Sequence, residues 1–214
     1  MKTKIVVFAS GSGSNFENIV IKAKEGYIPA EVSCLISDKA SAGAIKRAIN
    51  HGIKSIVINW REKEIAENKA LKILEKEKPT LIVLAGFMRI LSPNFISHWR
   101  WKILNIHPSL LPAFEGTTNA IELSIKKGLR ISGCTIHFVD ESVDGGPIIA
   151  QAAIPIAPND EKIEEKIHYL EHKLYPMVIK GILEKKIIFD EIGKKVIYKS
   201  VKIQSSEIFC PEID

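Results

Sequence analysis

The chain has 214 residues, of which 46% are hydrophobic and 26% are charged, enough for a sizeable core without forcing a split into separate domains. Its 30 basic residues exceed its 25 acidic residues by five, which favours anionic ligands. Because the lysines are scattered rather than clustered, small anions are favoured over nucleic acid, and an RNA-binding protein is the weaker alternative.

Short runs of Val and Ile alternate with longer segments of helical period in the first half of the chain. We predict strands at "KIVVFA", "EVSCLIS", "KSIVIN" and "TLIVLA", and helices between them at 15–25, 41–51 and 61–78. This alternation is typical of a parallel sheet, and runs that are apolar at every position indicate helices on both faces. The fold class is therefore α/β, with a doubly wound, mostly parallel sheet and a Rossmann-type N-terminal half.

The pattern changes after Pro93. A strand "WKILNIH", a loop and a helix near 119–127 precede two strands, "ISGCTIHFV" and "PIIAQAAIPI", which the Gly-rich turn "DESVDGG" joins. An amphipathic helix over about 160–184 leads into a tail whose alternation predicts a short peripheral hairpin. No repeat or linker interrupts the chain, so we expect one domain over 1–214.

The segment "ASGSGSN", residues 9–15, follows the first strand and opens the first helix. Its glycines and the positive end of the helix favour a phosphate site, and an ordinary turn capped by Ser14 or Asn15 is the alternative. Phe16 stands where a dinucleotide fingerprint needs its third glycine, although Asp38 could still bind a ribose, and the lysine of a Walker A loop is missing. We therefore expect a phosphorylated small substrate.

Asn105 and His107 lie two residues apart at the end of a predicted strand, directly before Pro108. Residues at this spacing point to the same side of a strand, so both side chains could meet one atom at the carboxyl end of the sheet. An amide N–H and an imidazolium N–H aimed at one point would stabilise an oxyanion. The alternative is a strand-end histidine bonded to backbone, with the asparagine serving the turn.

The turn "VDGGP", residues 143–147, supplies a carboxylate, Asp144. If Asp144 meets His107, its charge favours the protonated imidazole and raises the histidine pKa. Because Asp-Gly is a common turn dipeptide, a purely structural turn is the alternative.

Several reaction classes lack support. His168 and His172 have helical i, i+4 spacing but no third ligand nearby, and no G-x-S-x-G is present, so neither a metal site nor a serine hydrolase is expected. The cysteines, Cys34, Cys134 and Cys210, are odd in number and widely spaced, which predicts free thiols and a cytoplasmic protein. The apolar runs are too short for a signal peptide or a membrane span.

Five stretches stand in the order and near the spacing of one enzyme family: "SGSGSN", "VLAGFMRILSP", "LNIHPSLLP", "HFVDESVDGGPII" and "EHKLYP". Across about 4–185 the sequence resembles the phosphoribosylglycinamide formyltransferases, the glycinamide ribonucleotide transformylases of purine biosynthesis. The resemblance implies transfer of a formyl group from 10-formyltetrahydrofolate, a co-substrate, to the amine of 5-phosphoribosylglycinamide. It implies no metal, no permanently bound cofactor, no nucleic acid or membrane partner, and a monomer or homodimer.

The resemblance also assigns parts of the chain. It makes 1–100 a phosphate-binding half, 101–185 a folate-binding and catalytic half, and 186–214 a peripheral tail. The positions matching the catalytic trio are Asn105, His107 and Asp144. Those matching the ribonucleotide site are Gly13, Ser14, Asn15, His168, Tyr169, Leu170 and Glu171. Those matching the folate site are Lys63, Met88, Arg89, Ile90, Leu91, Asn105, Asp140, Glu141, Ser142, Val143 and Asp144.

Two positions depart from the family pattern. Lys63 stands where the family can carry an arginine near the folate tail. After "SLLP" the family usually reads Phe-Pro-Gly with a histidine soon after, whereas Glu115 replaces the proline here and residues 114–119 contain no histidine. This difference concerns the loop and its substrate contacts, not the trio.

The implied chemistry passes through a tetrahedral intermediate with an anionic oxygen. Donors from Asn105 and His107 would each contribute about 3 kcal/mol if they act as oxyanion-hole donors, and Asp144 would keep His107 charged and take or relay the amine proton. Related enzymes remain alternatives: a methionyl-tRNA formyltransferase would carry a further C-terminal domain, and a formyltetrahydrofolate deformylase an N-terminal regulatory one. A sugar-amine formyltransferase shares the trio. A protein that only binds folate or nucleotide would not need an oxyanion donor pair.

Overall fold

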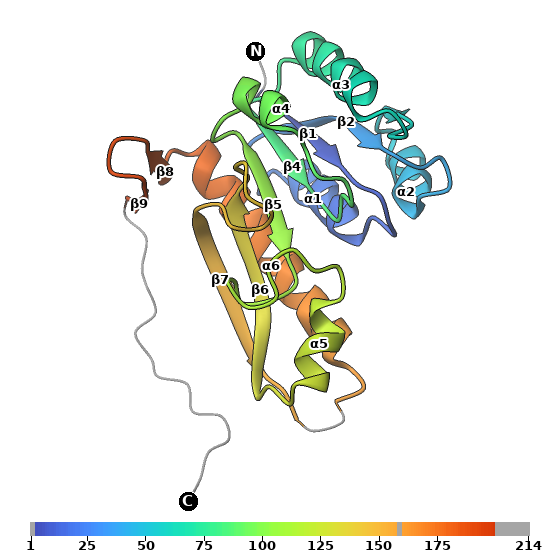
Figure 1. Cartoon of the computed structure of the whole chain (residues 1–214). Coiled ribbons are helices and arrows are strands. Elements are labelled where there is room, and N and C mark those ends of the chain that lie inside the picture. Colours follow the sequence, from blue (N-terminus) through green and yellow to red (C-terminus); the bar gives the residue numbers. More distant parts are fainter. Residues whose placement is uncertain (1–2, 158–159, 200–214) are drawn as a thin grey trace, which may run out of the picture.

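The computed structural model describes residues 3–157 and 160–199 (Figure 1). A seven-stranded sheet in the order β3-β2-β1-β4-β5-β6-β7 forms its centre. The strands from β3 to β5 pair in parallel, and β6 and β7 continue the sheet antiparallel. The strands of this sheet are β1 (Lys4–Phe8), β2 (Glu31–Ser37), β3 (Ser55–Val57), β4 (Leu81–Leu84), β5 (Ile103–His107), β6 (Ile131–Phe138) and β7 (Ile148–Pro155).

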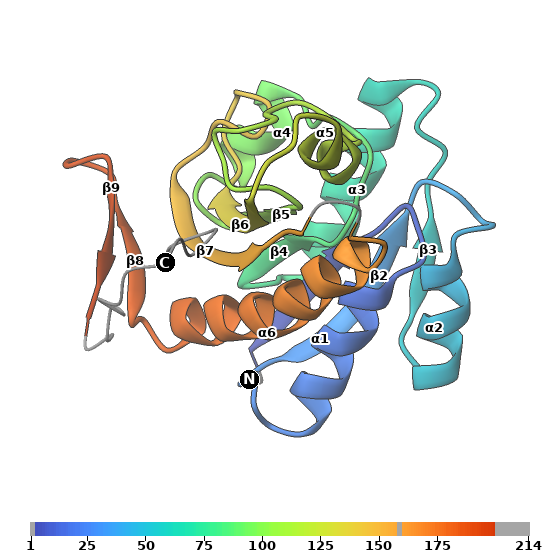
Figure 2. The same cartoon turned by 90° about the horizontal axis from the view of Figure 1, so that it is seen from below.

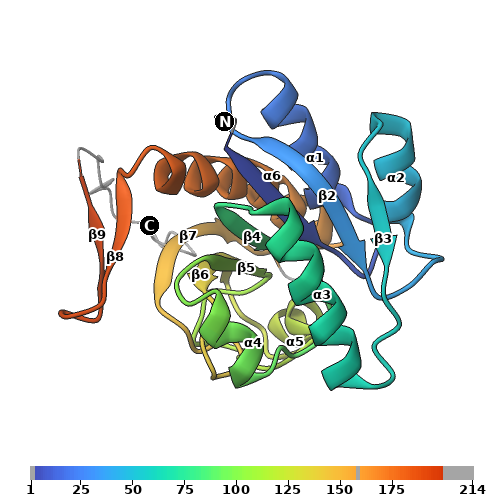
Figure 3. The same ribbon diagram turned by 90° about the horizontal axis from the view of Figure 1, so that it is seen from above.

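Helices lie on both faces of the sheet, as Figures 2 and 3 show from opposite sides. They are α1 (Ser14–Lys24), α2 (Gly43–His51), α3 (Lys63–Glu77), α4 (Pro93–His98), α5 (Ala120–Lys126) and α6 (Ile163–Leu183). Buried residues of α1, α2 and α6 share one core cluster, and those of α3 and α4 share another. The predicted α/β class with a mostly parallel sheet is confirmed.

The strand β1 shows why the apolar runs carry no alternation. Ile5 and Val7 enter the cluster beneath α1 and α6, whereas Val6 and Phe8 enter the cluster beneath α3 and α4. All four side chains are fully buried. Because successive residues of a strand face opposite sides, a sheet covered on both faces needs an apolar residue at every position.

A six-residue helix, α4, was not predicted from the sequence. Ser92 caps it by accepting a hydrogen bond from the Phe95 N–H at 3.1 Å, and Pro93 occupies its first turn. The pattern of a cap followed by proline was visible in the sequence. The helix is too short to show a hydrophobic period, so the apolar pattern of the sequence does not reveal it.

A two-stranded hairpin, β8 (Ile187–Asp190) and β9 (Lys195–Tyr198), follows α6, as the tail pattern predicted. It stands beside the large sheet rather than within it (Figures 2 and 3). The Phe189 ring packs on Trp101 with centroids 3.9 Å apart, and the Tyr198 hydroxyl donates to the Ile149 carbonyl at 2.5 Å. These contacts attach the hairpin near β7.

Two of the three cysteines fall within the described residues. Cys34 and Cys134 are buried and free, and burial raises their thiol pKa values to about 11 and about 12. Cys210 and the rest of the tail beyond 199 lie outside the described residues. None of the helices described here has the length and apolar character that a membrane crossing requires.

Candidate active site

A cavity of about 280 Å³ opens at the carboxyl ends of β4 and β5. Three loops surround it: the segment after β4, the loop after β5 and the turn between β6 and β7. Every expected folate position except Lys63 lines it, namely Met88, Arg89, Ile90, Leu91, Asn105, Asp140, Glu141, Ser142, Val143 and Asp144. A larger hollow of about 850 Å³ lies at the opposite end of the sheet and contains none of the trio, so the smaller cavity is the candidate site.

The trio predicted from the sequence comes together in this cavity. His107 Nδ1 lies 3.2 Å from Asp144 Oδ2, and the Asn105 amide donates to Asp144 Oδ1 at 3.2 Å. The turn therefore brings Asp144 to both residues of β5. The two donors meet the Asp144 carboxylate in this structure, whereas the sequence led us to expect them to aim at a substrate oxygen.

The second nitrogen of the His107 ring also faces an acceptor. Nε2 lies 3.1 Å from the carbonyl oxygen of Phe114, in the loop that departs from the family pattern. A neutral imidazole carries one N–H, so only the charged ring donates to Phe114 and Asp144 together. The surroundings thus provide hydrogen-bond acceptors for the protonated form.

Burial opposes that charge. It lowers the pKa of His107 below its ordinary value, and this effect exceeds the upward shift from the Asp144 carboxylate. The expected upward effect of Asp144 on the histidine pKa is present, but burial outweighs it. His107 is only 4% exposed, so the loss of hydration outweighs one charge partner.

Asp144 remains ionised at neutral pH. Burial acts to raise its pKa, but His137, His107 and the Gly116 N–H together lower it below the usual value. The Gly116 N–H donates to Oδ2 at 3.1 Å. The backbone φ of Asp144 is +57°, a left-handed conformation that Asp and Asn adopt more readily than most residues.

His137 is a member of the site that sequence reasoning missed. Its Nδ1 lies 2.9 Å from the Phe138 carbonyl, so in the neutral ring the proton is on Nδ1 and Nε2 accepts. Nε2 is 3.1 Å from the Asn105 amide nitrogen, and the imidazole is 3.7 Å from Asp144. The segment "CTIHFV" shows a histidine on a predicted strand, but its position opposite Asn105 comes from the register of β5 and β6, which the sequence does not reveal.

The glycine-rich loop ends at Gly13, which occupies the N-cap of α1 with φ +79°. No side chain makes a cap hydrogen bond, so the alternative in which Ser14 or Asn15 caps the helix is wrong. Ser14 and Asn15 lie instead in the first turn. The N-terminal N–H groups of the helix are thus left without a side-chain cap, as a helix that binds an anion requires.

The residues expected to hold the ribonucleotide come from α1 and α6. Asn15 donates to Glu171 Oε2 at 2.7 Å, which joins the two helices beside the loop. Burial raises the pKa of Glu171, and the bond from Asn15 opposes that shift. Tyr169 is 59% exposed, whereas Leu170 packs against a core cluster, so the four consecutive positions on α6 face different surroundings.

Arg89 has a partner that the sequence did not reveal. Its Nε donates to Asp38 Oδ2 at 2.6 Å, and the Asp38 side chain is fully buried while that of Arg89 is 42% exposed. Asp38 therefore anchors the segment after β4, and one oxygen of the carboxylate that could have bound a ribose accepts from Arg89 instead.

Comparison with known proteins shows the family of this chain. A protein-family model described as formyl transferase matches residues 3–179. The phosphoribosylglycinamide formyltransferase of Bacillus subtilis is 44% identical over 185 residues, which cover 84% of this chain and 94% of that protein. The trifunctional purine biosynthetic protein adenosine-3 of Gallus gallus is 38% identical over 90% of this chain, and the chain spans 20% of its length.

A solved structure extends the agreement to the fold. The crystal structure of glycinamide ribonucleotide transformylase 1 from Symbiobacterium toebii superposes with a TM-score of 0.87 at 34% identity, covering 92% of this chain and 94% of that one. The similarity thus spans both the glycine-rich loop and the trio. The chain belongs to the formyl transferase family and, within it, to the phosphoribosylglycinamide formyltransferases.

Proposed function

We propose that this chain transfers the formyl group of 10-formyltetrahydrofolate to the amine of 5-phosphoribosylglycinamide, giving the formylated ribonucleotide and tetrahydrofolate in purine biosynthesis. The observation that carries the proposal is the contact of Asn105 and His107 with Asp144 inside the cavity. Both substrates are small molecules, and the chemistry uses only side chains of this chain.

The positions of two loops support a two-substrate site. The glycine-rich loop after β1 and the segment after β4 are tied together, because Ser10 accepts from the Met88 N–H at 2.9 Å and its own N–H donates to Gly86 at 3.0 Å. A ribonucleotide held by its phosphate at Gly13–Asn15 would therefore lie beside a folate held at 88–91. Its amine would reach the end of β5, where the trio lies.

The hydrogen bonds around His107 indicate where the reacting oxygen would bind. The Phe114 carbonyl oxygen lies against His107 Nε2, and we assign the formyl oxygen to that acceptor position, which it would take by displacing the carbonyl. The oxygen becomes anionic as the amine attacks, so an N–H already aimed at an acceptor there would stabilise the transition state more than the ground state. The Asn105 amide would supply a second donor by releasing Asp144 or His137.

The attacking amine must also lose a proton. Asp144 is ionised and adjoins both donors, so it would accept the proton directly or through one water and return it to the folate nitrogen as the bond from that nitrogen to the formyl carbon breaks. Its charge would at the same time counter the effect of burial on His107. Asp144 would thus link proton removal to the stabilisation of the oxyanion.

The remaining assignments follow from position. The segment Met88–Leu91 would bind the folate ring mainly through backbone groups, since the Met88 and Ile90 side chains are largely exposed. The turn 140–144 would close over it. Glu171 and His168 would face the ribonucleotide, and Lys63, which does not line the cavity, would meet only the distal folate tail.

We further propose that the chain acts as one formyltransferase domain in the cytoplasm. β4, β5 and β6 hydrogen-bond in sequence, so the phosphate-binding and catalytic halves share a single sheet. Free buried thiols at Cys34 and Cys134 suit a reducing compartment.

The test is direct. Purified protein is incubated with 10-formyltetrahydrofolate and one amine at a time, and release of tetrahydrofolate is followed together with formylation of the amine. We expect release only when 5-phosphoribosylglycinamide is present, with equal amounts of both products. Release without any amine would identify a deformylase. Transfer to a sugar amine instead would identify a sugar-amine formyltransferase.

A further inference from the structure

Helix α2 lies beside α1 (Figure 2) and hydrogen-bonds to the glycine-rich loop, and none of its residues has been assigned to the ribonucleotide. The Ala44 N–H donates to the Gly11 carbonyl at 3.2 Å, and Arg47 Nε donates to the Ser12 carbonyl at 2.9 Å. Two successive carbonyls of the loop are therefore held by one helix.

Close packing keeps this arrangement in place. A Cβ added to Gly13 would lie 2.6 Å from Ala44 Cα, and one added to Gly43 would lie 2.9 Å from the Ser12 carbonyl oxygen. Glycine at both positions lets the loop and the start of α2 approach more closely than other residues allow. The contact is thus tight enough for the position of α2 to fix the orientation of the loop.

The geometry of the peptide bond determines where the N–H groups of the loop point. In a planar trans peptide the carbonyl and the following N–H point in opposite directions. Holding the Gly11 and Ser12 carbonyls toward α2 therefore turns the Ser12 and Gly13 N–H groups away from it. Within the described part of the chain these two N–H groups have no backbone acceptor, and successive free N–H groups of this kind form an anion-binding concavity.

Arg47 is itself fixed in place. Its Nη1 pairs with Glu17 on α1, and the other Glu17 oxygen lies 3.0 Å from His51 Nε2. The planar guanidinium thus contacts the loop with one nitrogen and α1 with another. A lysine offers a single nitrogen and would not make both bonds in this fork geometry.

We propose that Arg47 is a positioning residue for the ribonucleotide phosphate: by holding the Ser12 carbonyl, it aims the loop N–H groups at that phosphate. This inference rests on the proposed function, because it takes the loop as the phosphate site. Arg47 acts on the substrate through the loop and not through the chemical step, so its loss changes binding of the ribonucleotide alone.

The test compares Arg47→Met and Arg47→Lys with the wild type. Lys46→Met is the matched control, because it removes a cation from the exposed side of the same helix.

The measurements are KM for each substrate, kcat at saturation, the inhibition constant of inorganic phosphate competing with the ribonucleotide, and the melting temperature. We expect Arg47→Met to raise the ribonucleotide KM and the phosphate inhibition constant about tenfold, while kcat, the folate KM and the Lys46→Met values stay unchanged. Arg47→Lys should recover only part of the loss.

Three results would overturn the proposal: a wild-type ribonucleotide KM in Arg47→Met, full recovery by Arg47→Lys, or an equal rise in both KM values with a lowered melting temperature.

A second variant, Gly43→Ala, tests the proposal if Arg47→Met does not fold. Gly43→Ala keeps Arg47 but pushes on the Ser12 carbonyl, so it should also raise the ribonucleotide KM, and an unchanged value would contradict the proposal. A wild type that neither turns over nor binds phosphate would instead contradict the proposed function.

Discussion

The ionisation of His107 is decided by two opposing effects at one residue. Burial favours the neutral ring and lowers its pKa. The Asp144 carboxylate favours the charged ring and offsets part of that downward shift. The sequence indicated the partner but not the depth of burial, because burial depends on how three loops close over the ring. The charge pair alone therefore does not determine the net direction of the pKa shift.

The ion pair between Arg89 and Asp38 leads to a prediction about stability. Replacing Arg89 by Met leaves the fully buried Asp38 carboxylate without its partner, which should lower the free energy of unfolding by about 1–3 kcal/mol. The double variant Arg89→Met/Asp38→Asn removes the stranded charge and should regain much of that loss. Urea unfolding of both proteins measures the difference, and equal stability in the two would contradict a role for the charge.

The same variant tests folate recognition. If the segment 88–91 binds folate through its backbone, the folded double variant should keep a folate KM near that of the wild type. Loss of folate binding in a stably folded protein would show that the Arg89 side chain contributes directly.

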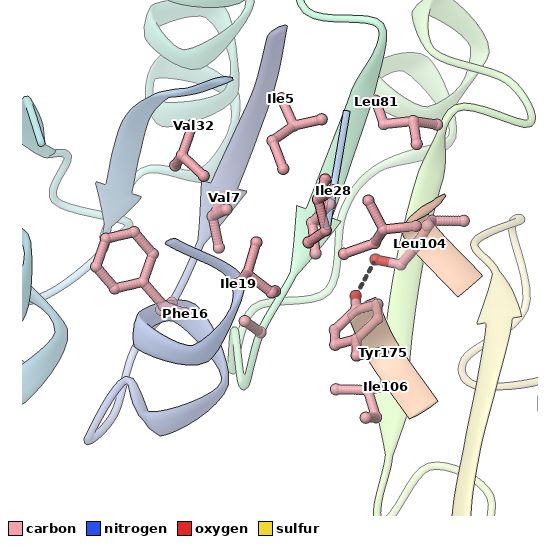
Figure 4. Close-up of a cluster of buried hydrophobic side chains, with 14 of the residues drawn as sticks. Ile5, Val7, Phe16, Ile19, Ile28, Val32, Leu81, Leu104, Ile106 and Tyr175 are labelled. Carbon is pink, nitrogen blue, oxygen red and sulfur yellow. Dashed lines mark hydrogen bonds between the residues drawn. The ribbon is translucent and has the colours of Figure 1, made fainter. Parts of the chain in front are cut away.

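At the scale of elements, β5 carries two members of the trio and is held by a residue of α6. The Tyr175 hydroxyl lies 2.9 Å from the Leu84 carbonyl of β4. It also lies 3.1 Å from the Leu104 carbonyl of β5 (Figure 4). Tyr175 is fully buried, and α6 continues as a helix through Pro176. This contact places the helix that carries Glu171 against the strand that carries His107.

Removing that hydroxyl should weaken the contact measurably. Tyr175→Phe leaves buried carbonyls without their donor, and we expect a loss of about 1–2 kcal/mol in the free energy of unfolding. Tyr198→Phe is the control, because Tyr198 lies on the hairpin and is partly exposed, and its hydroxyl donates to the Ile149 carbonyl of β7. Chemical unfolding of both variants gives the comparison, and a loss in Tyr198→Phe as large as in Tyr175→Phe would contradict the account.

The glycine-rich loop before α1 leads to a prediction for Gly13, and Gly11, two residues earlier, provides the control. Gly13→Ala places a Cβ 2.6 Å from Ala44 Cα at a positive φ, whereas a Cβ on Gly11 meets nothing within 4 Å. Gly13→Ala should therefore lower the free energy of unfolding by about 1 kcal/mol or more, and Gly11→Ala should leave it near the wild-type value. Equal melting curves for the two variants would show that the close approach of α2 is not a constraint.

For the whole molecule, much of the sheet could be predicted because its strands are continuous apolar runs separated by amphipathic helices. The trio could be predicted because its residues end a strand or lie on a glycine turn. The contribution of His137 could not, since it depends on the register between β5 and β6, and the pairing of Asp38 with Arg89 depends on two loops 51 residues apart. Such contacts arise from three-dimensional packing that no local pattern encodes.

The loop 114–119 shows the same limit. Its sequence departs from the family pattern, yet it supplies the Phe114 carbonyl to His107 and the Gly116 N–H to Asp144. Backbone groups make these contacts, so a change of side chains is compatible with them. The sequence shows the altered side chains and does not show these backbone contacts.

In the proposed reaction Asn105, His107 and Asp144 act together on the transferred formyl group, and Asp144→Asn is the decisive variant. Asparagine keeps the shape and tolerates the φ of +57°, but it removes the charge that raises the pKa of His107. The histidine pKa should then fall further, so the limb of the pH profile on which activity declines with rising pH should move to lower pH. The measurement is kcat and KM for both substrates across pH in the wild type and in Asp144→Asn. We expect kcat to fall by about 10²- to 10⁴-fold with little change in either KM, and a kcat near the wild-type value would contradict the account.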